Sequence, residues 1–185
     1  TFSAILVCDV STSMEETTPS GDKKIDVLKE VLEDFIDNFD PDRTEVAITL
    51  FAGDAIGHPT DIEYTPFRPF TTDKDSLKMA VENISQLYSG TNWNAAFLKK
   101  KSNPAVKYLS ALYYARPTVA RYKPVIIFLT DGNHLPKWGG PIEIFEIRSE
   151  ADSYGATVYC IQFGDEDLTS QNEQALEQQI GRAHV

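Results

Sequence analysis

Apolar and polar positions along the chain follow two periodicities. Short, nearly continuous apolar runs predict strands that are covered on both faces. Hydrophobic residues spaced three or four apart predict amphipathic helices between these runs, and the clearest lies at Lys23–Asn38, before Pro41. The predicted strands of this kind are Phe2–Cys8, Glu45–Phe51, Val125–Leu129 and Thr157–Phe163.

Weaker patterns fill the intervals. Residues Ile62–Phe70 predict an edge strand, because Pro66 and Pro69 cannot donate to a central ladder. A helix is predicted from Thr72, with Asp75 as the partner in a capping box. Its buried stripe is predicted to be Leu77, Val81, Ile84 and Leu87.

The second half of the chain continues the alternation. Trp93–Ala115 predicts a helix that Pro104 splits or kinks. Ile142–Tyr154 predicts another, which Gly155 ends. The last predicted elements are a short helix at Asn172–Ile180 and the start of a strand at Ala183–Val185.

Strands that alternate with helices indicate an α/β fold, with a doubly wound, mostly parallel sheet covered on both faces. The 185 residues suit a single domain over 1–185. Because the sequence stops as a strand begins, we expect a closing helix to be truncated or missing.

The amino-acid composition and charge limit which classes of function are open to the chain. Hydrophobic residues make up 42% and charged residues 24%, which is typical of a globular domain. The net charge of −11 argues against a nucleic-acid binder and suits either the attraction of cations and basic surfaces or simple solvation. Apolar runs stay well below the roughly 20 residues that span a bilayer, so no membrane insertion is expected.

Three polar segments stand out. The strand at Phe2–Cys8 leads into Asp9–Ser13, and the strand at Val125–Leu129 leads into Thr130–Gly132. Ser89–Asn92 lies between them in sequence. Ligand sites of doubly wound sheets lie at the carboxyl ends of the strands, so these segments are expected to converge.

The converging groups would be carboxylates and hydroxyls. Such oxygen ligands suit Mg²⁺ or Mn²⁺ first and Ca²⁺ next, and the lack of Cys and His disfavours zinc. Hydroxyl ligands leave a divalent ion under-neutralised and therefore able to bind an outside carboxylate. Each segment alone is typical of a turn or a helix cap, but the three together favour a metal site.

The sequences DVSTS, SGTN and FLTDG resemble the metal-ion-dependent adhesion site of von Willebrand factor A domains. The resemblance implies that Ser11 and Ser13 bind the metal directly and that Thr91 joins them in the ligand-bound arrangement. It implies that Asp9 and Asp131 act directly or through water, and that a Glu or Asp of a protein partner completes the coordination.

The same resemblance implies a six-stranded sheet of order 3-2-1-4-5-6 with an antiparallel third strand. Thr12 departs mildly from the family, in which Gly is frequent at this position. The stretch RYKPVIIFLTDGNHLPKW is similar to that of intracellular bacterial members associated with tellurite-resistance-type stress operons.

This strand order bears on the two cysteines. It places Cys8 and Cys160 two strand spacings apart, about 10 Å, whereas a disulfide needs Cα atoms within about 7 Å. Both thiols are expected to be free and buried, which favours a reducing, cytoplasmic compartment. A cell-surface or extracellular location stays open.

Other polar and aromatic residues have simpler interpretations. Of the three histidines, His58 and His184 are expected on loops or the surface, and only His134 lies near the proposed site. His134 and Trp138 are candidates for the partner-binding rim, with packing of Trp138 on its own domain as the alternative. Trp93 is expected in the core. Solvated surface is predicted for Asp165–Asp167 and for Glu33, Asp34, Asp37, Asp40 and Asp42.

Two functions follow. The first is a non-enzymatic, divalent-metal-dependent module that binds an acidic residue of a partner protein. The second is a metal-dependent phosphoryl-transfer hydrolase of the haloacid-dehalogenase type, since those enzymes also place an Asp at the end of the first strand. They use a second Asp two residues later, where this chain has Ser11, and a serine-hydrolase elbow is lacking as well. The first hypothesis is therefore preferred.

Overall fold

A computed structural model describes residues 1–53, 68–98, 111–135 and 141–163. Within this part of the chain, five strands form one sheet of order β3-β2-β1-β4-β5, in which only β3 is antiparallel to its neighbour. The predicted α/β fold is confirmed. The predicted six-strand order is not, since its last strand falls outside the described residues. The strands are β1 Phe2–Asp9, β2 Thr44–Phe51, β3 Arg68–Thr71, β4 Lys123–Thr130 and β5 Thr157–Gln162.

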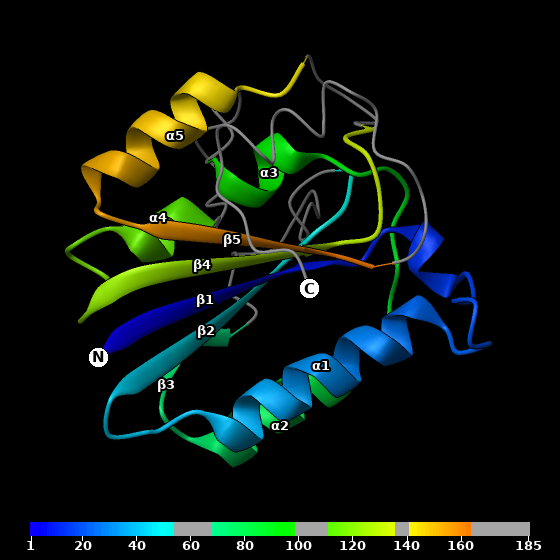
Figure 1. Ribbon diagram of the computed structural model, residues 1–185, viewed down its shortest axis with the longest axis horizontal. Coiled ribbons are helices and arrows are strands. Elements are labelled where there is room, and N and C mark those ends of the chain that lie inside the picture. The colour runs from blue at the N-terminus through cyan, green and yellow to red at the C-terminus, as the bar shows by residue number, and fades with distance from the viewer. Residues whose placement is uncertain (54–67, 99–110, 136–140, 164–185) are drawn as a thin grey trace, which may run out of the picture.

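Helices cover both faces of the sheet (Figure 1). Helices α1 (Lys24–Asn38) and α2 (Lys74–Glu82) pack on one face. Helices α3 (Trp93–Phe97), α4 (Ala111–Ala115) and α5 (Ile144–Ser153) pack on the other. None of the helices in the described ranges is long and apolar enough to cross a membrane.

Strand β1 explains why the core has two halves. Successive side chains of a strand point to opposite faces, so Ile5 and Val7 join the cluster under α3, α4 and α5. Leu6 and Cys8 join the cluster under α1 and α2. Every residue from Ser3 to Asp9 is buried, as expected for a central parallel strand.

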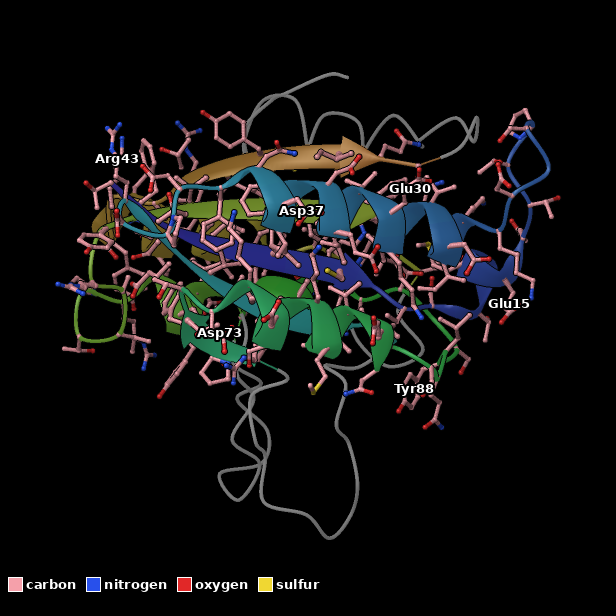
Figure 2. The ribbon with its side chains drawn as sticks, turned by 90° about the horizontal axis from the view of Figure 1, so that it is seen from below. Glu15, Glu30, Asp37, Arg43, Asp73 and Tyr88 are labelled. Carbon is pink, nitrogen blue, oxygen red and sulfur yellow. The ribbon has the colours of Figure 1, made fainter. Side chains whose placement is uncertain are left out.

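Helices α1 and α2 lie side by side, and the exposed Glu30 and Asp37 of α1 are seen on this face of the molecule (Figure 2). Lys78 Nζ lies 2.6 Å from Asp37 Oδ1 and links the two helices. The acidic run from Glu33 to Asp42 is exposed apart from Glu33, which is half-buried, so the expected solvated surface is confirmed.

Several predicted boundaries were wrong. Helix α2 is capped by Asp73 and not by Thr72, because the Asp73 carboxylate accepts hydrogen bonds from the backbone N–H groups of Asp75 and Ser76. The helix ends at Glu82, so Leu87 lies beyond it and is only half-buried. Helix α3 already ends at Phe97, whereas Pro104 is outside the described ranges. Gly155 follows α5 with a φ of 65°, as predicted for a stop.

The cysteines are both free. Cys8 on β1 and Cys160 on β5 are separated by β4, which pairs with each of these strands. Cys8 is fully buried, but Cys160 is only partly buried, so the expectation of two buried thiols holds for Cys8 alone. Cys160 is more accessible because β5 is the outermost strand on its side of the described sheet.

Candidate functional site

The polar segments following β1 and β4 meet at one edge of the sheet. The chain runs from β1 outward to β2 and β3 and then returns to β4 on the other side of β1, so the connections diverge between β1 and β4. This is where doubly wound sheets bind ligands. The register pairs Cys8 with Leu129, and therefore the side chains of Asp9 and Asp131 emerge at the same edge.

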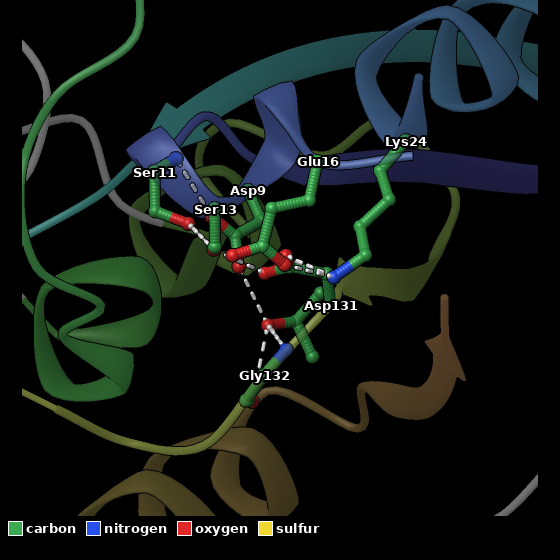
Figure 3. A network of polar contacts seen from close by, with 8 residues as sticks. Asp9, Ser11, Ser13, Glu16, Lys24, Asp131 and Gly132 are labelled. Atoms are coloured by element: carbon green, nitrogen blue, oxygen red, sulfur yellow. Dashed lines mark hydrogen bonds and ion pairs between the residues drawn. The ribbon is translucent and has the colours of Figure 1, made fainter. Parts of the chain in front are cut away.

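A chain of hydrogen bonds joins the two segments (Figure 3). The backbone N–H of Ser11 donates to Asp9 Oδ1 at 2.8 Å. The hydroxyl oxygens of Ser11 and Ser13 are 2.9 Å apart, and Ser13 Oγ donates to Asp131 Oδ1 at 3.0 Å. Ser13 belongs to a short 3₁₀ helix, Thr12–Glu15, which turns its hydroxyl back toward the strand ends. Four of the five predicted site residues are therefore brought together.

Asp9 is the most deeply buried acidic residue of this cluster, with no exposed surface. Its Oδ2 accepts a hydrogen bond from the Thr130 hydroxyl at 2.7 Å. Burial, followed by the negative charge of Asp131, raises the pKa of Asp9 to about 6, against the lowering effect of the hydrogen bonds from Ser11 and Thr130. The site therefore holds ionised Asp9 at a cost that a cation would relieve.

Lys24, the first residue of α1, also belongs to the site and was not predicted. Its Nζ lies 3.3 Å from Asp131 Oδ2 and 2.9 Å from Glu16 Oε2, and its side chain is only 5% exposed. A signal existed in the sequence, because Lys24 precedes the buried Leu28 and Leu32 at intervals of four and lies on the same face of the helix.

Thr91, the fifth predicted residue, is held between the other two segments by backbone pairing. Ser11 and Tyr88 form a parallel bridge, and Thr91 and Leu135 form an antiparallel bridge in which each N–H donates to the other carbonyl at 2.8 Å. Thr91 is 5% exposed. The three segments are thus bonded to one another, although no contact of the Thr91 hydroxyl with the serines or aspartates is seen.

Gly53 is a second residue that the sequence did not reveal. It follows β2, and a Cβ added to it would lie 2.2 Å from the carbonyl oxygen of Ser89. Asn92 N–H donates to the neighbouring Ala52 carbonyl at 2.7 Å. The segment that carries Thr91 is therefore packed directly against the backbone at the end of β2, and only glycine permits this approach.

The predicted rim is described in part. His134 is half-buried, and its Nδ1 accepts a hydrogen bond from the Trp93 backbone N–H at 3.1 Å. Leu135 beside it is 67% exposed, whereas Trp93 is fully buried, as expected of a core residue. Trp138, His58, His184 and Asp165–Asp167 lie outside the described residues.

The donor set decides which cations the cluster suits. Among the described residues, no group of three or more His, Cys, Asp or Glu side chains is placed to hold a metal. The candidate ligands that hydrogen bonds bring together are mixed: hydroxyls of Ser11 and Ser13 beside the carboxylate of Asp131, with Asp9 one hydrogen bond away. Such neutral and anionic oxygens match hard divalent cations.

Comparison with known proteins agrees with this architecture. A model of the von Willebrand factor type A domain matches residues 5–184. No curated protein matches the chain in sequence. Two crystal forms of proximal thread matrix protein 1 from the mussel byssus share the fold, with TM-scores of 0.62 and 0.60 at 19% and 18% identity. These alignments cover 99% and 98% of this chain but only 41% of either mussel chain.

The family match covers β1 from Ile5 onward and all of the other described strands, and it includes Asp9 and Asp131. Domains of this type generally serve as protein-interaction or adhesion modules and not as enzymes. The chain belongs to the von Willebrand factor type A domain family.

Proposed function

We propose that this domain binds a partner protein through a divalent cation held by Asp9, Ser11, Ser13, Thr91 and Asp131. The cation is Mg²⁺ or Mn²⁺ in preference to Ca²⁺, and it captures an Asp or Glu side chain of the partner. When bound, the ion supplies a Lewis-acidic position for that carboxylate. The domain's own residues orient the oxygens and limit the negative charge around the ion.

One observation carries the proposal. Ser11 Oγ, Ser13 Oγ and Asp131 Oδ1 form a row with spacings of 2.9 and 3.0 Å. Neighbouring oxygens around octahedral Mg²⁺ lie about 2.9 Å apart, given Mg–O distances of about 2.1 Å, whereas Ca²⁺, with its longer bonds and variable coordination number, accepts a wider range of spacings. The same spacings are hydrogen-bond distances, so these oxygens hold one another in place without an ion.

The charges favour an outside carboxylate as the remaining ligand. Asp9 and Asp131 bring two negative charges, and Lys24 brings one positive charge into contact with Asp131. Net neutralisation of a divalent cation is therefore incomplete, and a further anion is attracted. His134 and the exposed Leu135 lie beside Thr91 and are proposed as the described part of the partner-binding rim.

The hydrolase alternative finds no specific support. Ser11 occupies the position at which haloacid-dehalogenase-type enzymes use their second Asp, and its backbone and hydroxyl are already engaged with Asp9 and Ser13. Turnover of a generic phosphomonoester by the wild-type protein, abolished in Asp9→Ala, would reverse the preference.

The direct test is capture of partner proteins with and without EDTA. Capture is expected in Mg²⁺, to be lost in EDTA, and to be weakened in Asp9→Ala and Thr91→Ala while circular dichroism shows an intact fold. Thr12→Ala is the matched control, because Thr12 is exposed and its hydrogen bond to the Tyr88 carbonyl comes from the backbone N–H, which the substitution keeps. Unchanged capture in EDTA would rule out the ion as the binding element.

The tellurite-resistance-type subfamily and the cytoplasmic location stay predictions. The subfamily prediction rests on the resemblance of the stretch around Asp131, and the location rests on the expectation of free thiols. Together they extend the proposal to a bacterial stress-response protein. Fractionation of the native host cell would test the location.

A further inference from the structure

Lys24 is a buried ammonium at the edge of the proposed metal site. Its side chain is 5% exposed, compared with 1% for Asp131 and 58% for Glu16. Water screens the contact with Glu16, so the buried partner of Lys24 is Asp131 (Figure 3).

Two general tendencies oppose this placement. Lysine is almost never buried unless it is paired, because an ammonium loses its hydration. Lys24 is also the first residue of α1, where the positive end of the helix dipole disfavours a cation. Lys24 satisfies the first tendency only through its carboxylate partners and runs against the second, so its burial inside this polar cluster is expected to have a functional reason.

The geometry around Asp131 indicates that reason. Asp131 Oδ1 accepts the Ser13 hydroxyl, and Asp131 Oδ2 faces Lys24 Nζ. The two oxygens therefore have different partners. Lys24 fixes the plane of the carboxylate while leaving Oδ1 on the side of the two serines.

We propose that Lys24 is a positioning residue that holds Asp131 in its binding orientation in the metal-free protein and weakens the site's affinity for divalent cations. The inference rests on the proposed function. An ion bound through Oδ1 shares the carboxylate with the ammonium on Oδ2, and like charges so close repel in a poorly hydrated site. Lys24 thus keeps the ion both exchangeable and incompletely neutralised, which favours capture of an outside carboxylate.

The test measures Mn²⁺ affinity by titration in wild type, Lys24→Met and Lys24→Gln. Glutamine keeps an N–H donor for Asp131 but removes the charge, so it separates orientation from repulsion. Lys23→Met is the matched control: Lys23 is adjacent and pairs with Glu15 at 2.7 Å, but its side chain is 51% exposed.

Both Lys24 variants are expected to bind Mn²⁺ at least ~10-fold more tightly than wild type. Lys23→Met should stay within about twofold, because its charge is exposed and screened. In EDTA, Lys24→Met should melt at a lower temperature than wild type, and the melting temperature of Lys24→Gln should lie between the two. Opposite changes in metal-free stability and metal affinity are not expected of a purely structural residue, whose loss weakens both.

The outcomes separate the two proposals. Failure of the wild type to bind Mn²⁺ overturns the proposed function, and this inference with it. Binding by wild type with equal or weaker binding by Lys24→Gln overturns the role of Lys24 alone. Lys24→Gln decides the matter if Lys24→Met does not fold in EDTA, since it retains a hydrogen-bond donor to Asp131.

Discussion

Substitution of Gly53 by alanine should distort the segment that carries Thr91. The added Cβ would lie 2.2 Å from Ser89 O and 3.3 Å from Gly90 Cα, and both of these atoms belong to backbone. Because neither can rotate away as a side chain could, the segment or the end of β2 must shift. Overpacking of this kind costs about 1–3 kcal/mol.

The expected loss is measurable by thermal unfolding. For a chain of 185 residues, each kcal/mol corresponds to about 2–4 °C, so Gly53→Ala should melt about 2–12 °C below wild type. The displacement reaches Thr91, and the stabilisation by Mg²⁺ should therefore shrink as well. Differential scanning calorimetry with Mg²⁺ and with EDTA gives both quantities.

Gly132 provides the matched control. It follows Asp131 in the other half of the site, but a Cβ there meets nothing within 4 Å and its φ is not left-handed. Gly132→Ala should leave the melting temperature unchanged or raise it slightly, since alanine restricts the unfolded chain. If Gly53→Ala and Gly132→Ala lowered the melting temperature equally, the close packing of Gly53 against Ser89 would not be the cause of the loss.

Three further substitutions test separate parts of the structure. In EDTA at pH 7, Asp9→Asn should unfold with a free energy about 1–3 kcal/mol higher than that of wild type, because folding raises the pKa of Asp9 from 3.8 to about 6 and so disfavours its ionised form. As the pH falls from 6 toward 4, Asp9 of the wild type becomes protonated and the wild type regains this stability. In melts at a series of pH values, the difference in stability between the two proteins should therefore vanish at low pH. Ser13→Ala should cost about 1–2 kcal/mol in EDTA, since it removes the bridge to Asp131, and should abolish stabilisation by Mg²⁺. Asp73→Ala should cost about 1 kcal/mol in urea unfolding, equally with and without Mg²⁺, because it removes only a helix cap; a metal-dependent loss would contradict that assignment.

The parts of the fold that the sequence predicted correctly depend on local pattern. Continuous apolar runs ending in Asp9 and just before Asp131 indicated strands whose carboxyl ends meet, and the register places these residues at one edge. The serines at positions 11 and 13 were predicted because their spacing and their family resemblance coincide. These features need no knowledge of distant contacts.

The residues that were missed depend on tertiary contacts. Lys24 counts as polar in a periodicity analysis, and only the nearby carboxylate of Asp131 makes its burial tolerable. Gly53 is identifiable only when Ser89 is known to pack against it. Thr72 was predicted as the cap because Asp75 follows it by three residues, but Asp73 is an equally suitable cap residue, and the sequence alone does not decide between the two.

The most direct measurement is an anomalous difference map from crystals grown with Mn²⁺. The account predicts one strong peak within bonding distance of Ser11 Oγ, Ser13 Oγ and an Asp131 oxygen. That peak should be absent from crystals of Ser13→Ala grown in the same way. A fully Mn²⁺-soaked wild-type crystal with no peak at these three oxygens would contradict the claim that the segments after β1 and β4 share one ion.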